Sequence, residues 1–340
     1  ENQEDLVYGN VYNHGVVTRM LPYLKPHKLK LLIAILAMLV FSGSQVSFPW
    51  LIKIAIDNYI MMKDFAGLTG IAALFIVLAA FNLGGLYLMQ VMLIKVGQAI
   101  LYRLRSEMFQ HIEALSLRFF DKAHVGQLMS RVQGDVYQLQ EFISVVVMCL
   151  GDLLVLIWII SALLLMNVKL GLISMAVLPI LFLVVLVWQP RARKSFVRVR
   201  AAISVVNGSL NDNIAGVRVV QSMNRQEYNL EEFKINNRNN MSANMTSSKL
   251  SAGLMPPVDI LTAMAIGLAL IFGASMVADG SLEVGAMIAF VLYIQRFFDP
   301  IRSITMQYSS LQRAMASGSR IFQTLESVPD LADKVDAVDL

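Results

Sequence analysis

The chain has 340 residues, of which 56% are hydrophobic and 15% charged, and its mean hydropathy is +0.61. Such a high hydropathy excludes an ordinary soluble domain of this size. Four histidines and a single cysteine, Cys149, exclude a disulfide framework and a Cys/His metal site. The formal net charge of +4 is less informative than the positions of the basic residues along the chain.

The first 29 residues are predicted to form a polar tail followed by an interfacial helix. Residues 1–13 are polar and acidic, and no cleaved signal peptide is expected there. Residues 16–23 are amphipathic and are followed by Lys25 and Pro26, which favours a helix that lies on the inner leaflet and turns into the membrane at the proline. The alternative is a disordered basic leader.

Six segments are long and apolar enough to cross a bilayer, which takes about 20 residues. They are residues 30–52, 68–94, 142–166, 169–189, 254–278 and 284–295. The sixth continues as an amphipathic helical pattern over residues 297–321, so one of its faces is expected to line water or polar partners. The predicted fold class is an all-α membrane protein with six long transmembrane helices that extend into the cytoplasm.

The positions of Lys and Arg predict the orientation, because these residues favour the cytoplasmic side. Four Lys or Arg residues lie in residues 1–30, five in residues 103–131, ten in residues 191–249 and five in residues 296–334. The opposite loops hold only Lys53, Lys63 and Lys169. Both termini and the two large loops are therefore predicted to be cytoplasmic.

The two large loops continue the helical periodicity of the spans, over residues 96–111, 191–210 and 223–249. At 1.5 Å per residue, about 25 such residues reach roughly 35–40 Å beyond the lipid. Each loop is thus predicted to be two long helices joined by a short turn.

The tip of the first loop combines adjacent aromatic residues, Phe119 and Phe120, with a carboxylate, Asp121, and Gly126 breaks the pattern that follows. One interpretation is a short helix whose phenylalanines dock into a partner protein. The other is a self-packed loop with a buried pair of phenylalanines.

The tip of the second loop lies in residues 207–221. Gly216, among small and β-branched residues, suits a tight helix–turn approach. Asn211 and Asp212 are candidate caps of a short helix there.

Polar side chains at membrane depth are the candidates for a substrate cavity. The polar candidates are Asn82, Gln90, Asp152, Tyr293, Gln295 and Arg296, and Met306 is a further candidate for the cavity. Asp152 either faces the interior and attracts a cationic substrate, or is satisfied by a neighbouring helix. The twenty methionines suit a deformable apolar surface, although most methionines in such a chain face lipid or the core.

Several motifs, taken in order and spacing, resemble the transmembrane domain of ATP-binding-cassette (ABC) exporters of the six-helix, domain-swapped type. The resemblance covers residues 18–326. Its residues are Tyr23 to His27, Pro49, Ile56 and Asp57; Phe119 to Asp121, Gly126, Leu128, Ser130, Arg131, Asp135 and Val136; Asn207, Gly216, Val219, Val220, Glu227 and Phe233; and Pro300, Leu311 to Ala314, Ala316, Ser317 and Arg320 to Phe322.

The resemblance implies that the two tips are coupling helices, near residues 116–126 and 209–217, which rest on nucleotide-binding domains. The implied contact residues are Phe119, Phe120, Asp121, Gly126, Asn211, Asp212, Ile214, Gly216 and Val217. The chain departs from the family at Asp212, where glutamate is usual, and at residues 222–224, which replaces a basic-small-aromatic run. These departures affect the expected ATPase contacts and leave the expected fold unchanged.

The sequence contains no G-x-x-x-x-G-K-[ST] motif, so no phosphate-binding loop and no catalytic site are predicted in this chain. Residues 30–326 are predicted to form the transmembrane domain and residues 327–340 a linker toward a nucleotide-binding domain. ATP and Mg²⁺ are expected on that domain, and no metal is expected here.

The resemblance further implies a second transmembrane half, as a homodimer or heterodimer, in a bacterial plasma (inner) membrane. The expected cargo is an amphipathic drug or lipid, and no nucleic-acid partner is expected. Two alternatives stay open: a secondary transporter or channel without an ATPase, and a membrane scaffold or regulator that does not transport.

Overall fold

The computed structural model describes residues 13–122 and 125–327, and every regular element in this part of the chain is helical. The helices form two compact units. Unit 1 comprises Glu1–Met166 and Leu282–Leu340, and unit 2 comprises Asn167–Ser281. We describe each unit by itself.

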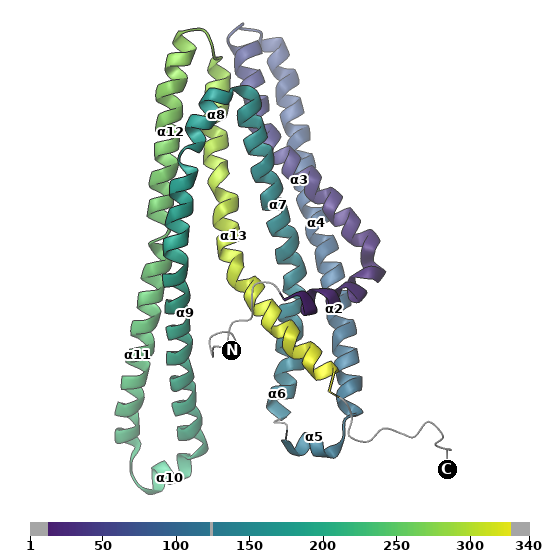
Figure 1. Ribbon diagram of the computed structural model, residues 1–340, viewed down its shortest axis with the longest axis vertical. Helices are drawn as coiled ribbons and strands as arrows, with labels where there is room; N and C mark the ends of the chain where they lie inside the picture. The colour runs from purple at the N-terminus through teal and green to yellow at the C-terminus, as the bar shows by residue number, and fades with distance from the viewer. Residues whose placement is uncertain (1–12, 123–124, 328–340) are drawn as a thin grey trace, which may run out of the picture. The chain divides into compact units, whose positions relative to one another are not determined.

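Unit 1 contains the first three spans and the sixth. Within it α3 packs along α4, and α7 packs along α13 (Figure 1). Its α-helices are α2 (His14–Leu24), α3 (Lys28–Ile54), α4 (Phe65–Glu113), α5 (Leu117–Lys122), α6 (Val125–Ser130), α7 (Val136–Met166) and α13 (Val284–Leu325). Short turns complete it: a 3₁₀ turn η1 (Lys25–His27) and the π-helical turns η2 (Ala55–Ile60) and η3 (Arg131–Asp135).

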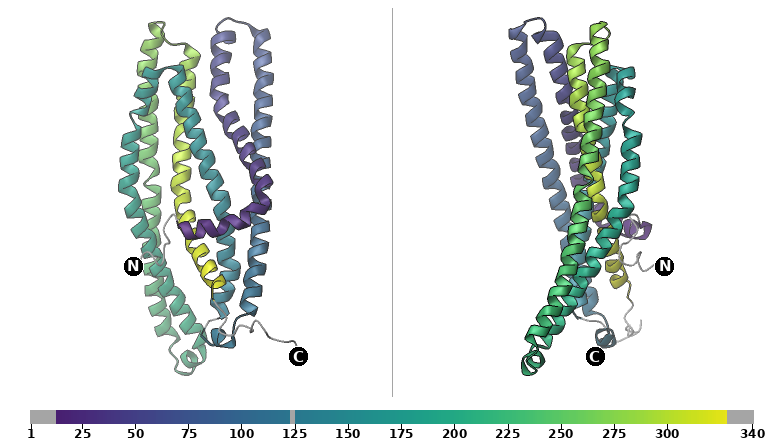
Figure 2. Two further views of the ribbon diagram at one scale, coloured as in Figure 1. Left: turned by 45° about the vertical axis from the view of Figure 1, so that its right-hand side comes forward. Right: turned by 90° about the vertical axis from the view of Figure 1, so that its left-hand side faces the viewer.

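Unit 2 is a long helical hairpin. Its helices are α8 (Val168–Met175), α9 (Leu178–Ala215), α10 (Val217–Ser222), α11 (Gln226–Ala252) and α12 (Met255–Ala278). α9 lies alongside α11, and α8 packs against α12 (Figure 2).

Six helical stretches of the described residues are long and apolar enough to cross a membrane, which confirms the predicted fold class. The first five are 39 to 53 residues long, against the 20 or so that a bilayer needs, so they continue well beyond it. The sixth, Val284–Ile304, belongs to α13, which runs through Pro300 to Leu325 as the amphipathic pattern predicted.

The predicted fourth span, residues 169–189, is not one continuous helix. α8 ends at Met175 and α9 begins at Leu178, with Pro179 in its first turn, where the missing N–H costs no helical hydrogen bond. A broken helix is a feature of secondary transporters, in which the break binds ions. Residues 173–180 carry no ionisable side chain.

The N-terminal helix α2 is present as predicted, and the side chain of Asn13 caps it by accepting from the N–H groups of Gly15 and Val16. Its buried face, Val16 and Met20, joins the core of unit 1. Its position on a membrane surface stays a prediction.

The core of unit 1 lies where α2, α4, α7 and α13 meet. Its fully buried side chains include Val96, Leu104, Met108, Val136 and Leu139. Burying each side chain of this size contributes roughly 1.5–3 kcal/mol. This core fixes the base of α13 against the helices that lead to the first tip.

Candidate functional site

The first predicted tip is a short helix, α5, between α4 and the start of α7. Its Phe119 and Phe120 rings pack edge to face with their centroids 5.7 Å apart. Both rings are half-buried, whereas Asp121 and, in α6, Gly126 are exposed. The pair is thus neither fully exposed nor fully packed within the chain, and a partly open aromatic surface remains at the tip.

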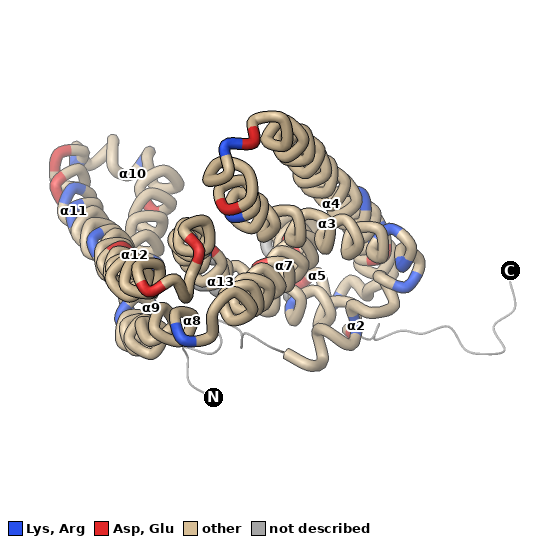
Figure 3. Tube along the Cα trace, turned by 90° about the horizontal axis from the view of Figure 1, so that it is seen from above, with Lys and Arg blue, Asp and Glu red and all other residues tan. Residues whose placement is uncertain are grey.

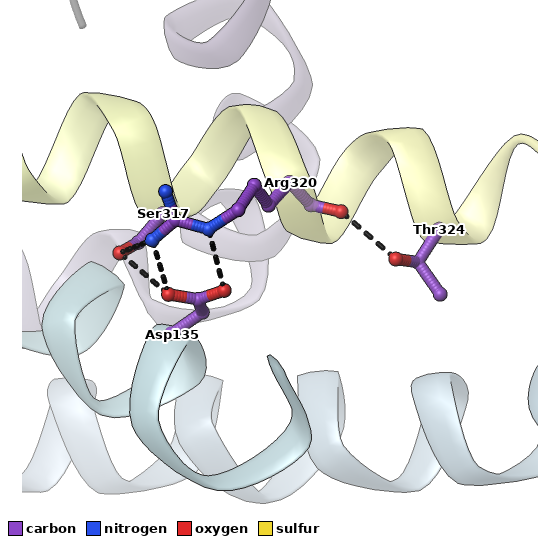
Figure 4. Close-up of polar contacts among 4 residues, drawn as sticks. All are labelled: Asp135, Ser317, Arg320 and Thr324. Atoms are coloured by element: carbon purple, nitrogen blue, oxygen red, sulfur yellow. Dashed lines mark hydrogen bonds and ion pairs between the residues drawn. The ribbon is translucent and has the colours of Figure 1, made fainter. Parts of the chain in front are cut away.

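Directly after this tip, Asp135 ends the π-helical turn η3 and binds the C-terminal part of α13 (Figure 4). Arg320 donates from Nε to Oδ2 at 2.9 Å and from Nη2 to Oδ1 at 2.5 Å. The hydroxyl of Ser317 donates to Oδ1 at 2.8 Å. Asp135 is only 8% exposed, and a carboxylate removed from water to this degree requires such partners.

A second contact strengthens the same connection, since Arg131 donates from Nη1 to Oγ1 of Thr324 at 2.9 Å. Thr324 in turn donates to the carbonyl of Arg320 at 2.9 Å (Figure 4). The hydrogen bond to Asp135 raises the pKa of Arg320, so the guanidinium stays charged. We call Arg131, Asp135, Ser317, Arg320 and Thr324 the tip junction. It links the first tip to the sixth span.

The second tip differs from the prediction, because α9 extends to Ala215. Three residues assigned to the tip helix lie instead in the last turns of α9: Asn211, Asp212 and Ile214. The short helix at the tip is α10, which begins at Val217, and Gly216 joins the two helices through an N–H bond of 2.9 Å to the carbonyl of Asp212. No side chain caps α10, so the capping roles predicted for Asn211 and Asp212 were wrong.

Asparagines position this tip in a way that the sequence did not reveal. Asn229 of α11 donates from Nδ2 to Oδ1 of Asn213 in α9 at 2.6 Å, which ties the two helices together just before the turn. Asn224 adopts the left-handed conformation at φ 52°, a region in which asparagine is among the best tolerated residues.

Three of the predicted cavity residues are hydrogen-bonded to the backbone of α3. Arg296 finds a free acceptor in α3 because of Pro49. Proline has no N–H, so the carbonyl of Gln45 has no partner within the helix. The carbonyl acceptors are Gln45 for Arg296 (2.9 Å), Val46 for Tyr293 (2.7 Å) and Phe41 for Asn82 (3.2 Å). Tyr293 is 1% exposed, so in this structure it packs helix against helix.

The remaining candidates have different surroundings. Gln90 and Gln295 are exposed, and the side chain of Met306 lies outside the described residues. Asp152 of α7 is hydrogen-bonded to Ser303 of α13, but its Oδ2 is buried and has no partner among the described residues. The neighbouring helix therefore satisfies only part of this carboxyl group, and one oxygen remains at membrane depth for a ligand or water.

A second group of polar contacts lies at the opposite end of α13, and the sequence analysis did not predict it. Asp57 of η2 accepts from the N–H of Gly285 at 2.6 Å, which satisfies a donor that the first turn of a helix cannot pair internally. Lys53 lies 3.7 Å from Asp57 Oδ2 and 2.6 Å from Glu283 Oε2. Lys53 lowers the pKa of Glu283 through this hydrogen bond and its charge.

Comparison with known proteins decides what kind of chain this is. The family model described as the ABC transporter transmembrane region matches residues 31–301. The chain belongs to this family. Its six long helices are therefore those of an ABC exporter transmembrane domain.

Three similar proteins have names that refer to ATP. The ABC transporter ATP-binding protein YknV of Bacillus subtilis is 29% identical, over 98% of this chain and 56% of YknV. An ATP-dependent lipid A-core flippase of Desulfotalea psychrophila is 29% identical, over 96% of this chain and 58% of the flippase. A putative multidrug export ATP-binding/permease protein, YgaD of Bacillus subtilis, is 28% identical, over 95% of this chain and 57% of YgaD. The chain thus spans somewhat more than half the length of these relatives.

The sequence has no phosphate-binding loop motif. Within the described residues, no three His, Cys, Asp or Glu side chains are grouped so that they would hold a metal ion.

Proposed function

We propose that this chain is the membrane-spanning half of an ATP-driven exporter, which moves amphipathic drugs or lipids out of the cytoplasm or the inner leaflet by alternating access. The observation that carries the proposal is the family match over residues 31–301. The names of two relatives, a lipid A-core flippase and a putative multidrug exporter, support this cargo class. Two such halves, with their nucleotide-binding domains, would form the transporter.

The proposed coupling path runs from the tips to the sixth span. Movement of a nucleotide-binding domain would displace α5 through the half-buried surface of Phe119 and Phe120. The tip junction, in which Asp135 binds Arg320, would pass this displacement to α13. Coupling of this kind requires that the two membrane conformations differ in their affinity for ATP.

Asp152 is the proposed contact for cargo that carries positive charge. Its support is the buried Oδ2 atom that lacks a partner among the described residues. A single carboxylate at membrane depth attracts an organic cation strongly, because lipid screens the charge poorly. Neutral and anionic lipids would gain nothing from it.

Both tips are tested by combining Phe120→Ala with Gly216→Trp in the full-length gene product. The first change removes half of the aromatic pair, and the second places a large side chain in the turn between α9 and α10. We expect stimulation of ATP hydrolysis by cargo to fall at least five-fold, while the apparent melting temperature and basal hydrolysis change little. The measurement is ATPase activity in liposomes titrated with a lipophilic cation.

The matched control combines Phe109→Ala with Gly208→Trp. Phe109 is 59% exposed on α4, and a Cβ atom added at Gly208 on α9 meets nothing within 4 Å. The control should retain stimulation. Equal stimulation in the test variant and the control would contradict the assignment of α5 and α10 as coupling helices.

A further inference from the structure

A groove of about 570 Å³ lies between α3 and α4 of unit 1. Its lining is entirely apolar and includes no titratable side chain. On α3 the lining residues are Ile33, Leu36, Ala37 and Val40; on α4 they are Val77, Ala80, Phe81, Gly84, Gly85 and Leu88. Both helices belong to the membrane-spanning set, and the visible traces of α3 and α4 are mostly tan, the colour of residues other than Lys, Arg, Asp and Glu (Figure 3).

The groove exists because small residues on one helix meet larger ones on the other. Gly85 brings the helices close, since a Cβ atom there would lie 3.1 Å from the backbone of Ala37 and of Phe41. Asn82 fixes one end by donating to the carbonyl of Phe41 at 3.2 Å. At Gly84, by contrast, a Cβ atom would meet nothing within 4 Å, so space is left open along this stripe.

The length of the groove matches one leaflet. Its lining on α4 runs from Val77 to Leu88, which at 1.5 Å per residue is about 16 Å. Half of a hydrocarbon core of about 30 Å is about 15 Å. A groove of this length and composition fits hydrocarbon chains from a lipid of a single leaflet.

Two lysines identify which leaflet and which headgroup. Lys30 lies three residues before Ile33 on the lining stripe of α3, and Lys95 lies seven residues beyond Leu88 on that of α4, so helical spacing places each on the same face as the groove. Because Gly85 meets Ala37 and Phe41, both lysines lie about 10–16 Å from that contact, at the same end of the antiparallel pair.

Both lysines are exposed, and neither takes part in an ion pair among the described residues. Their end of the groove is the one that the distribution of Lys and Arg assigns to the cytoplasm. Basic residues at the cytoplasmic ends of membrane helices attract anionic lipid headgroups.

We propose that this groove is a binding site for an anionic phospholipid of the cytoplasmic leaflet. Its acyl chain occupies the space between α3 and α4, and its phosphate lies between Lys30 and Lys95. The lipid is a resident of the transporter, distinct from the cargo, and its binding requires no ATP. The proposal therefore stands or falls independently of the export function.

The test is native mass spectrometry of the detergent-purified full-length gene product, titrated with phosphatidylglycerol and, separately, with phosphatidylethanolamine. Gly84→Leu fills the groove and is expected to lower phosphatidylglycerol occupancy at least five-fold. Gly70→Leu on the same helix is the matched control and should leave occupancy unchanged. A Cβ atom added at Gly70 also meets nothing within 4 Å. Equal occupancy in the two variants would overturn the site.

The headgroup is tested by neutralising charge without touching the groove. Lys30→Gln with Lys95→Gln should abolish the preference for phosphatidylglycerol over phosphatidylethanolamine. Lys63→Gln with Lys169→Gln removes the same charge from the opposite side and should keep the preference. A preference that survives the first pair of substitutions would overturn the phosphate contact.

Photo-crosslinking covers the case in which Gly84→Leu fails to fold. Phosphatidylglycerol with a diazirine in its acyl chain should label peptides from residues 33–40 and 77–88 of the unaltered protein. Label confined to other helices would overturn the proposal.

Discussion

Replacing Asp135 with alanine is expected to lower the free energy of unfolding by about 2 kcal/mol and to uncouple the first tip from the sixth span. The substitution removes the acceptor of two charge-assisted hydrogen bonds from Arg320 and one from Ser317. Breaking a fully buried ion pair costs about 3–5 kcal/mol. The expected loss is smaller because the side chain of Arg320 is 43% exposed and water screens part of the interaction.

The measurement is thermal unfolding of the purified protein, with Arg320→Ala and the double variant completing a mutant cycle. The cycle should give an interaction energy of about 1–2 kcal/mol between Asp135 and Arg320. Glu231→Ala is the control, since Glu231 pairs with Lys234 on the exposed face of α11 and its loss should cost about 0.5 kcal/mol or less. An Asp135→Ala effect no larger than this control would contradict the structural role of the junction.

Replacing Gly285 with alanine is expected to destabilise the protein by about 1–3 kcal/mol, although alanine is the better helix former. A Cβ atom at this position would lie 2.6 Å from the carbonyl oxygen of Lys53 and 2.7 Å from the carboxyl group of Asp57. Because the first of these atoms belongs to the backbone, the start of α13 must shift away from α3. The shift also weakens the bond from the Gly285 N–H to Asp57.

Gly70→Ala supplies the matched control with the opposite sign. Gly70 lies inside α4, where an added Cβ meets nothing within 4 Å, so alanine should stabilise by about 0.4–1 kcal/mol. Thermal unfolding of the two variants side by side measures the difference. Stabilisation by Gly285→Ala would show that α3 and α13 do not approach as closely as the structure indicates.

The sequence was sufficient to predict the helices, because hydropathy and 3.6-residue periodicity are strong over long segments. The six spans, their extension beyond the membrane and the continuation of α13 past Pro300 were all predicted. The break at Ala176–Val177 was not, since the apolar pattern runs through it and only Pro179 marks it. Short interruptions inside apolar runs leave little trace in composition.

Contacts between segments that are distant in the chain could not be predicted from the sequence. Asp135, Ser317 and Arg320 were all among the motif residues, yet the 182 and 185 positions that separate their partners gave no reason to pair them. The pairing of Asp57 with Gly285 was missed for the same reason. At the second tip, Asn211 and Asp212 were taken for caps because these residue types favour caps, whereas the helix simply continued through them.

Transport in proteoliposomes tests the proposed export function most directly. The full-length gene product, inserted with its ATP-binding side outward, would be mixed with a fluorescent lipophilic cation and either ATP and Mg²⁺ or a non-hydrolysable analogue. The account predicts accumulation of the cation inside the vesicles with ATP and none with the analogue. Equal movement without hydrolysis would identify a secondary transporter or channel. Such movement would contradict ATP-driven export, and so would no movement of the cation, or of a labelled lipid used in its place, by the protein together with its partner half.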